Sequence, residues 1–91
     1  MSVKVFISGQ VQGVGFRQFI KQFARKLKIT GWVRNLKDGR VEAFFQGEEK
    51  DVKKLIRACC KGPFLAHVKD VQVIEENLQK QGESYTDFIV C

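Results

Sequence analysis

Residues 9–17 read Gly9-Gln10-Val11-Gln12-Gly13-Val14-Gly15-Phe16-Arg17, and they join two hydrophobic patterns of different period. Before them, residues 3–9 place Val3, Val5 and Ile7 at every second position, which predicts a strand. After them, apolar residues recur at three- and four-residue spacing, which predicts an amphipathic helix over residues 16–28. The segment is therefore a glycine-rich turn between a strand and the N-terminus of a helix.

A turn of this kind can bind an anion. The first N–H groups of a helix lack partners, its dipole is positive there, and successive N–H groups of a glycine-rich turn can converge on one anion. Arg17 adds a planar cation that matches phosphate oxygens in pairs. The segment does not match the known nucleotide-binding loops. No Lys-Ser or Lys-Thr follows it, as G-x-x-x-x-G-K-[ST] requires, and its glycine spacing differs from G-x-G-x-x-G. The residues alone leave two interpretations open, a small phosphate-binding loop and a plain tight turn.

Two segments resemble the signatures of the acylphosphatase family. Residues 9–17 match the family's first pattern, G-x-V-Q-G-V-x-[FM]-R, and Gly31-Trp32-Val33-Arg34-Asn35 resembles the second. They occur in the family's order, and Thr86-Asp87-Phe88-Ile89 resembles its last strand. The resemblance covers essentially the whole chain, so we expect one domain over residues 1–91. It implies metal-independent hydrolysis of small acyl phosphates.

The resemblance also assigns roles to residues. Asn35 is expected to hold the attacking water in line, and Arg17 to grip the phosphate. The phosphate-binding loop supplies backbone N–H groups from Gln12, Gly13, Val14, Gly15, Phe16 and Arg17. Without the doubled signature, Arg17 would be read as a surface charge and Asn35 as a turn residue. Trp32 is expected in the core or as a wall of the site, whereas Arg34 should point away from Asn35 along the strand.

The remaining chain predicts an α+β fold. Asp38-Gly39 marks a hairpin turn over residues 37–40, and Gly62-Pro63 ends a second helix. The order is β-α-β-β-α-β with a short extra C-terminal strand, a ferredoxin-like sandwich with both helices on one face of a mainly antiparallel sheet. After the first strand and helix, we expect strands at 29–36 and 41–46, a helix at 49–60, a strand at 68–75, a polar loop at 79–84 and a last strand at 85–90.

The 91-residue chain carries a net charge of +6, and the charge is uneven. Residues 1–45 contain nine Lys or Arg against two Asp or Glu, whereas residues 46–91 contain seven against eight. A positive half that holds both signatures attracts small anions and also nucleic acid. RNA-recognition domains share the element order, but residues 39–45 place Glu42 inside the segment where such domains carry their aromatic motif. The other alternative is a non-catalytic anion-binding domain, which would keep the glycine-rich loop but would not need Asn35 to orient a water molecule.

The residue types restrict the chemistry. His67, the single histidine, is expected in a loop outside both signatures, and no acid cluster near the glycine turn suits Mg²⁺. We therefore expect no metal or other cofactor. A site without a metal or an acid suits a leaving group that departs as a carboxylate. Cys59, Cys60 and Cys91 form no C-x-x-C pair and predict neither a zinc site nor a disulfide framework. The sequence leaves a disulfide between Cys91 and either of the others open.

The expected partners are small. No run of eighteen apolar residues occurs, and the N-terminus lacks the apolar core of a signal peptide, so we expect a cytoplasmic protein without a membrane partner. The resemblance implies an anionic acyl-phosphate substrate, with inorganic phosphate or sulfate as competing anions and no nucleic acid. We expect a monomer, although the sequence does not fix the oligomeric state.

Overall fold

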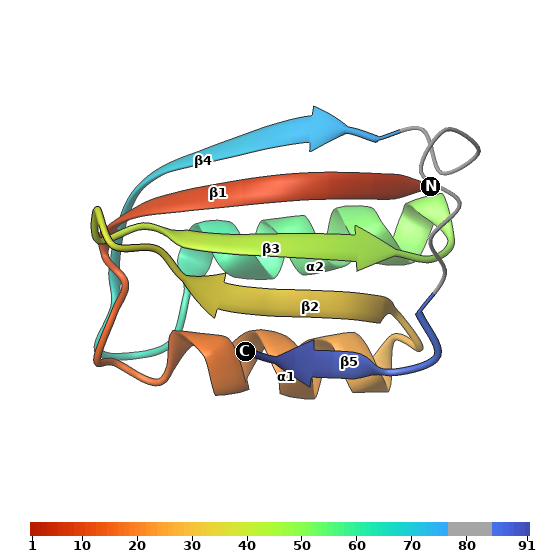
Figure 1. The fold of residues 1–91 in the computed structure, drawn as a ribbon, viewed down its shortest axis with the longest axis horizontal. Coiled ribbons are helices and arrows are strands. Elements are labelled where there is room, and N and C mark those ends of the chain that lie inside the picture. The colour runs from red at the N-terminus through yellow and green to blue at the C-terminus, as the bar shows by residue number, and fades with distance from the viewer. Residues whose placement is uncertain (77–84) are drawn as a thin grey trace.

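The computed structural model describes residues 1–76 and 85–91 as five strands and two helices (Figure 1). The predicted polar loop at 79–84 lies outside the described residues. The elements are β1 (Ser2–Gln10), α1 (Phe16–Lys26), β2 (Thr30–Asn35), β3 (Val41–Gln46), α2 (Glu49–Lys61), β4 (His67–Glu75) and β5 (Phe88–Val90).

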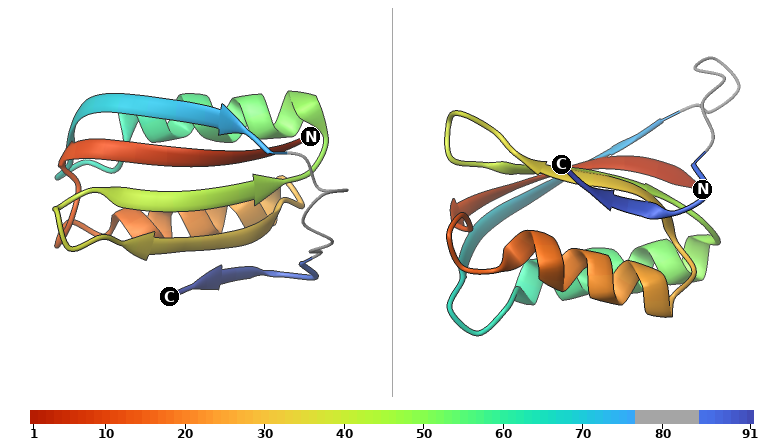
Figure 2. Two further views of the ribbon diagram at one scale, coloured as in Figure 1. Left: turned by 45° about the horizontal axis from the view of Figure 1, so that its top comes forward. Right: turned by 60° about the horizontal axis from the view of Figure 1, so that its bottom comes forward.

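The five strands form one mixed sheet in the order β4-β1-β3-β2-β5. β1 pairs antiparallel with β3 and β4, β2 pairs antiparallel with β3, and β5 is parallel to β2. Both helices lie on the same face of the sheet, and none of the described residues forms a helix on the other face (Figure 2). The predicted ferredoxin-like class and the short extra C-terminal strand are both confirmed.

The core lies between the sheet and the helices, because each element turns its apolar stripe toward the other layer. Val3, Val5 and Ile7 of β1 are fully buried, as the period of two predicts. The helices follow the period of 3.6: α1 buries Phe16, Ile20 and Ala24, and α2 buries Val52, Leu55 and Cys59. Burial raises the pKa of the Cys59 thiol, which therefore stays neutral and packs as an apolar residue.

Several predicted boundaries were wrong by a few residues. α1 ends at Lys26, because the chain turns at Lys28, whose φ of 58° is left-handed. β5 begins at Phe88 and not at residue 85. His67, expected in a loop, is the first residue of β4 and pairs with Gln10. These differences arise because strand pairing and chain reversal decide where an element ends, and neither is visible in local periodicity.

The three cysteines are free thiols, with Cys60 and Cys91 exposed. In the described part of the chain, neither helix has the length and apolar content to cross a membrane.

Candidate active site

The loop of residues 11–15, called the phosphate loop after its predicted role, connects β1 to α1. Its glycines and Gly9, at the start of the signature, are required for different reasons. Gly13 and Gly15 have φ of 75° and 79°, and a Cβ at either would meet nothing within 4 Å. Their left-handed backbone is therefore the requirement, since it turns the chain into α1. Gly9 is different, because a Cβ there would collide with the backbone carbonyl of His67 in β4. The first glycine of the signature thus serves strand packing, at a bulge between Ser8 and Gly9.

The N-terminus of α1 keeps its positive character. Gly15 is the N-cap and offers no side chain to the first N–H groups, and the first turn contains no acidic residue. The chain therefore neither caps nor neutralises this end of the dipole, which suits an anion approaching from the loop.

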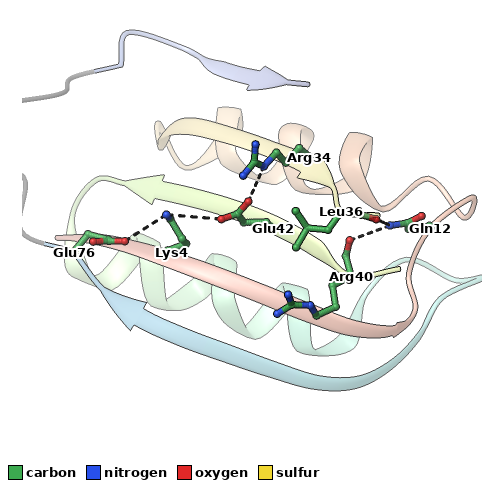
Figure 3. A network of polar contacts seen from close by, with 7 residues as sticks. All are labelled: Lys4, Gln12, Arg34, Leu36, Arg40, Glu42 and Glu76. Carbon is green, nitrogen blue, oxygen red and sulfur yellow. Dashed lines mark hydrogen bonds and ion pairs between the residues drawn. The ribbon is translucent and has the colours of Figure 1, made fainter. Parts of the chain in front are cut away.

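Gln12 fixes the phosphate loop to the β2–β3 hairpin. Its Nε2 donates hydrogen bonds to the backbone oxygens of Leu36, at 2.7 Å, and of Arg40, at 3.0 Å (Figure 3). Leu36 directly follows Asn35, so these bonds join the first signature to the second. Sequence reasoning gave Gln12 a backbone role alone and missed this function of the side chain. Only its place in the signature could have drawn attention to it, because its partners are 24 and 28 residues away.

A cavity of about 310 Å³ lies where the loop, α1, β2 and β5 meet. It brings the Arg17 and Asn35 side chains, which the sequence predicted as the catalytic pair, to one site. Of the predicted loop residues, Gly13, Gly15 and Phe16 also line it, whereas Gln12 and Val14 do not. Sequence reasoning missed three of its walls, which are Val11, Gln18 and Val90. The lining residues are Val11, Gly13, Gly15, Phe16, Arg17, Gln18, Asn35 and Val90.

Asn35 is the last residue of β2 and pairs with Val41 of β3. Its Oδ1 is buried and accepts no hydrogen bond from the residues that the structure describes. A buried polar atom without a partner costs about 1–3 kcal/mol, so this amide is held ready to bind something that enters the cavity. A water molecule that donates a hydrogen bond to this Oδ1 would point one of its protons at Asn35 and away from the rest of the cavity.

Arg17, in the first turn of α1, is held by the C-terminal segment. Its Nη1 donates to the backbone oxygen of Cys91 at 2.9 Å. Within residues 1–76 and 85–91 the guanidinium makes no other hydrogen bond, so several of its five donors remain for an anion. The bond fixes the orientation of the guanidinium, because β5 is itself paired with β2.

The start of β5 is tied down by Asp87. One oxygen of its side chain accepts the backbone N–H of Phe88 at 2.7 Å, and the other lies 3.2 Å from Arg25 of α1. The bond from Phe88, more than the charge of Arg25, holds the pKa of the Asp87 carboxyl below its usual value. Asp87 therefore stays ionised and helps to bring Val90 to the cavity and the backbone oxygen of Cys91 to Arg17.

The structure places Trp32, Arg34 and His67 outside this cavity. Trp32 is neither core nor a wall of this cavity, because it lies on the opposite side of β2 from Asn35 and stacks on Phe44 with ring centroids 6.3 Å apart. Arg34 points away from Asn35 as predicted, and its Nε donates to Glu42 at 2.6 Å. His67 is exposed and lines a separate cavity with Gly9 and Lys69.

The cavity contains cationic and amide groups but no acid, histidine or cysteine side chain among its described lining residues. Across residues 1–76 and 85–91, no three His, Cys, Asp or Glu side chains come together as metal ligands. The site is thus suited to hold an anion, neutralise its charge and orient a water molecule. Fold and cavity together define a ferredoxin-like protein with a cavity suited to an anion between the β1–α1 loop and the end of β2.

Comparisons with known proteins agree with this description. The acylphosphatase family model matches residues 3–90. The acylphosphatase of Roseiflexus sp. is 54% identical over 69 residues, covering 76% of this chain and 74% of that protein. That of Alcanivorax borkumensis is 45% identical over 86 residues and 94% of each chain. The crystal structure of the acylphosphatase from Bacillus subtilis superposes with a TM-score of 0.91 at 34% identity, covering 99% of this chain and 97% of that one. This chain belongs to the acylphosphatase family, and it is a hydrolase that acts on an acid anhydride.

Proposed function

We propose that this chain hydrolyses the carboxyl–phosphate bond of small acyl phosphates to a carboxylate and inorganic phosphate, without a metal ion or other cofactor. The main support is that Arg17 and Asn35, one from each signature, line the same cavity as the glycine-rich loop. The described residues that line this cavity include no set that would ligate a metal, so the proposed means of catalysis are positioning and charge neutralisation.

In this proposal the phosphate of the substrate sits in the loop. Backbone N–H groups from Gln12 to Arg17 donate to its oxygens, and the positive end of the α1 dipole favours its charge. The Arg17 guanidinium binds two phosphate oxygens at once with the donors that Cys91 does not use. These contacts neutralise charge on the equatorial oxygens as the transition state forms.

The attacking water is held by the Asn35 amide. The water oxygen forms a bond to phosphorus, and the bond between phosphorus and the carboxyl oxygen breaks, so the electron pair leaves with the carboxylate. The proton of the water passes to an oxygen of the substrate's own phosphate, since no side chain lining the cavity in the described structure is placed as a base. Products and reactants then balance as acyl phosphate plus water giving carboxylate plus phosphate.

The residue types that line the cavity also determine which class of phosphate compound can react. A carboxylate leaves without protonation, whereas an alkoxide needs a general acid. The proposal therefore covers acyl phosphates and not alkyl phosphate monoesters. It also includes inorganic phosphate and sulfate as competing anions, because both fit the loop. We further propose one domain over residues 1–91, acting as a cytoplasmic monomer.

The decisive experiment measures phosphate release from a simple acyl phosphate and from an alkyl phosphate monoester, each with and without a chelator. We expect release from the acyl phosphate alone, at a rate that the chelator does not change. Activity that a chelator abolishes and Mg²⁺ or Zn²⁺ restores would overturn the metal-free mechanism. Comparable rates on both substrates would overturn the substrate class, and no hydrolysis of either would leave a non-catalytic anion-binding domain.

A further inference from the structure

The face of the sheet without helices carries a second cavity of about 310 Å³. It lies across β2 and β5 from the catalytic cavity, because side chains alternate along a strand: Ile89 and Cys91 line the second cavity, and Val90 lines the first. Its lining residues are Lys4, Trp32, Arg34, Tyr85, Ile89 and Cys91.

One side of this cavity is a continuous aromatic surface. Trp32 and Phe44 lie nearly parallel, with an interplanar angle of 21°, and Phe44 contacts Tyr85 at 5.6 Å between centroids. The guanidinium carbon of Arg34 lies 5.3 Å from the centre of the Trp32 ring. Aromatic faces of this kind stack against other planar rings, and the half-exposed Ile89 adds an apolar contact.

The charged side chains that line the cavity are those of Lys4 and Arg34, and carboxylates outside the lining hold them in place. Glu42, whose side chain is only 6% exposed, accepts the Arg34 Nε at 2.6 Å and lies 3.7 Å from the Lys4 ammonium (Figure 3). Glu76 lies 3.7 Å from Lys4 on its other side. Both Lys4 contacts are longer than a hydrogen bond, so the ammonium keeps donors for another partner.

Arg34 likewise has binding capacity left. Its side chain is 53% exposed, and only its Nε takes part in a hydrogen bond to another described residue. No Asp or Glu is among the described residues that line the cavity itself. Two oriented cations beside an aromatic surface are complementary to a planar ring that carries a negative charge.

We propose that this cavity is an accessory binding site for a small planar aromatic anion, with its ring against Trp32 and its carboxylate or phosphate group at Arg34 and Lys4. The volume is at the lower end of the range for small-molecule sites, roughly 300–1,000 Å³, and so fits one compact ring system. This site is separate from the phosphate loop and does not depend on the proposed reaction.

Trp32 is the single tryptophan of the chain, so intrinsic fluorescence reports directly on this cavity. The test titrates adenosine 5′-monophosphate and, separately, benzoate, with inorganic phosphate present throughout at a concentration that saturates the phosphate loop. We expect a saturable change in Trp32 fluorescence with at least one of the two anions. Adenosine, which has the ring without the charge, should bind at least about tenfold more weakly than its monophosphate.

Three variants locate the binding. Ile89→Glu places a negative charge at the rim without disturbing Glu42, and Arg34→Gln removes one cation; each should weaken binding about tenfold. Lys54→Gln is the matched control, because Lys54 is exposed on α2, on the other side of the sheet. Unchanged hydrolysis of an acyl phosphate by Ile89→Glu checks that this variant is folded.

The proposal is overturned if neither anion gives a saturable change, or if Ile89→Glu, still active, binds as tightly as the wild type. It is also overturned if a short single-stranded RNA binds at least tenfold more tightly than the monophosphate with a steep dependence on salt, because the face would then be a nucleic-acid surface.

Discussion

Arg17 and Asn35 line the same cavity, but their surroundings differ in a way that separates their proposed roles. Arg17 is a cation at the positive end of a helix, already oriented by Cys91, so we expect it to contact the phosphate in both the bound substrate and the transition state. Asn35 is neutral, and its buried Oδ1 lacks a partner among the described residues. A neutral amide of this kind gains most when the water it holds begins to attack, which is an interaction specific to the transition state.

We therefore expect different kinetics from the two variants. Asn35→Ala should lower kcat by about 10²–10³-fold, or ~3–4 kcal/mol, with the competitive Ki of phosphate nearly unchanged. Arg17→Lys should lower kcat and weaken phosphate binding together, because an ammonium lacks the planar two-point contact. The measurement is kcat with the Ki of phosphate for each variant.

His67→Ala is the control for these variants, since His67 lies outside the cavity, and its turnover should stay within about tenfold of the wild type, or ~1.4 kcal/mol. If Asn35→Ala weakens phosphate binding as much as it slows turnover, Asn35 is a phosphate ligand and the water-orienting role is wrong.

At the scale of elements, the site depends on how the loop and two strands are held against one another. Gln12 ties the phosphate loop to the hairpin that follows Asn35, and Arg17 ties α1 to the end of β5. Neither contact is one of the backbone hydrogen bonds within a helix or between paired strands. Both fix the distance between the anion site and the amide that faces it, and a displacement of about 1 Å in such a site can cost on the order of 10²-fold in rate.

Gln12→Ala tests this coupling, because it removes both hydrogen bonds from the loop to Leu36 and Arg40. Each bond is worth ~0.5–1.5 kcal/mol at most, and both are exposed, so the free energy of unfolding should fall by about 1 kcal/mol. We expect kcat/KM to fall at least about tenfold, since loop and Asn35 lose their fixed separation. Chemical denaturation and steady-state kinetics measure the two effects.

Gln22→Ala is the matched control, because Gln22 is exposed on α1 outside the cavity lining. It should leave both quantities close to wild type. A Gln12→Ala protein with wild-type kcat/KM would show that strand pairing alone holds the loop in place.

For the whole molecule, the important feature is that a small core supports two opposite faces. The helix-covered face of the sheet supplies the buried side chains that give the domain its stability, whereas the other face carries the ion pairs of Glu42 with Lys4 and Arg34 and the aromatic surface. The anion site lies where elements of both halves of the chain meet, and a bound anion should therefore stabilise the entire fold.

We expect inorganic phosphate at about ten times its Kd to stabilise the folded protein by ~1.4 kcal/mol, which raises the Tm by roughly 5–10 °C for a domain of this size. Asn35→Ala should retain this shift, and Arg17→Lys should lose most of it. Arg57→Lys, at an exposed position on α2, is the matched control and should behave like the wild type. Thermal unfolding with and without phosphate gives the answer, and a full shift in Arg17→Lys would place the anion elsewhere.

Much of the fold and of the site follows from the sequence by itself. A period-two run predicted β1, the period of 3.6 predicted α1 and α2, and Asp38-Gly39 predicted the hairpin whose second strand is β3. These signals are local, because burial of one face of an element is written directly in the spacing of its apolar residues. The two signatures predicted the family and named Arg17 and Asn35, which the structure brings to one cavity.

Tertiary structure alone decided how the site is held. Gln12 finds its partners 24 and 28 residues away, and Arg17 finds Cys91 at a separation of 74 residues. It also decided that Trp32 lies on the face of the sheet away from the helices and that Val90 lines the cavity of Arg17 and Asn35. Contacts of this range depend on sheet order and on the register of β5 against β2. Register and strand order emerge from packing of the whole chain, and no local spacing of residues encodes them.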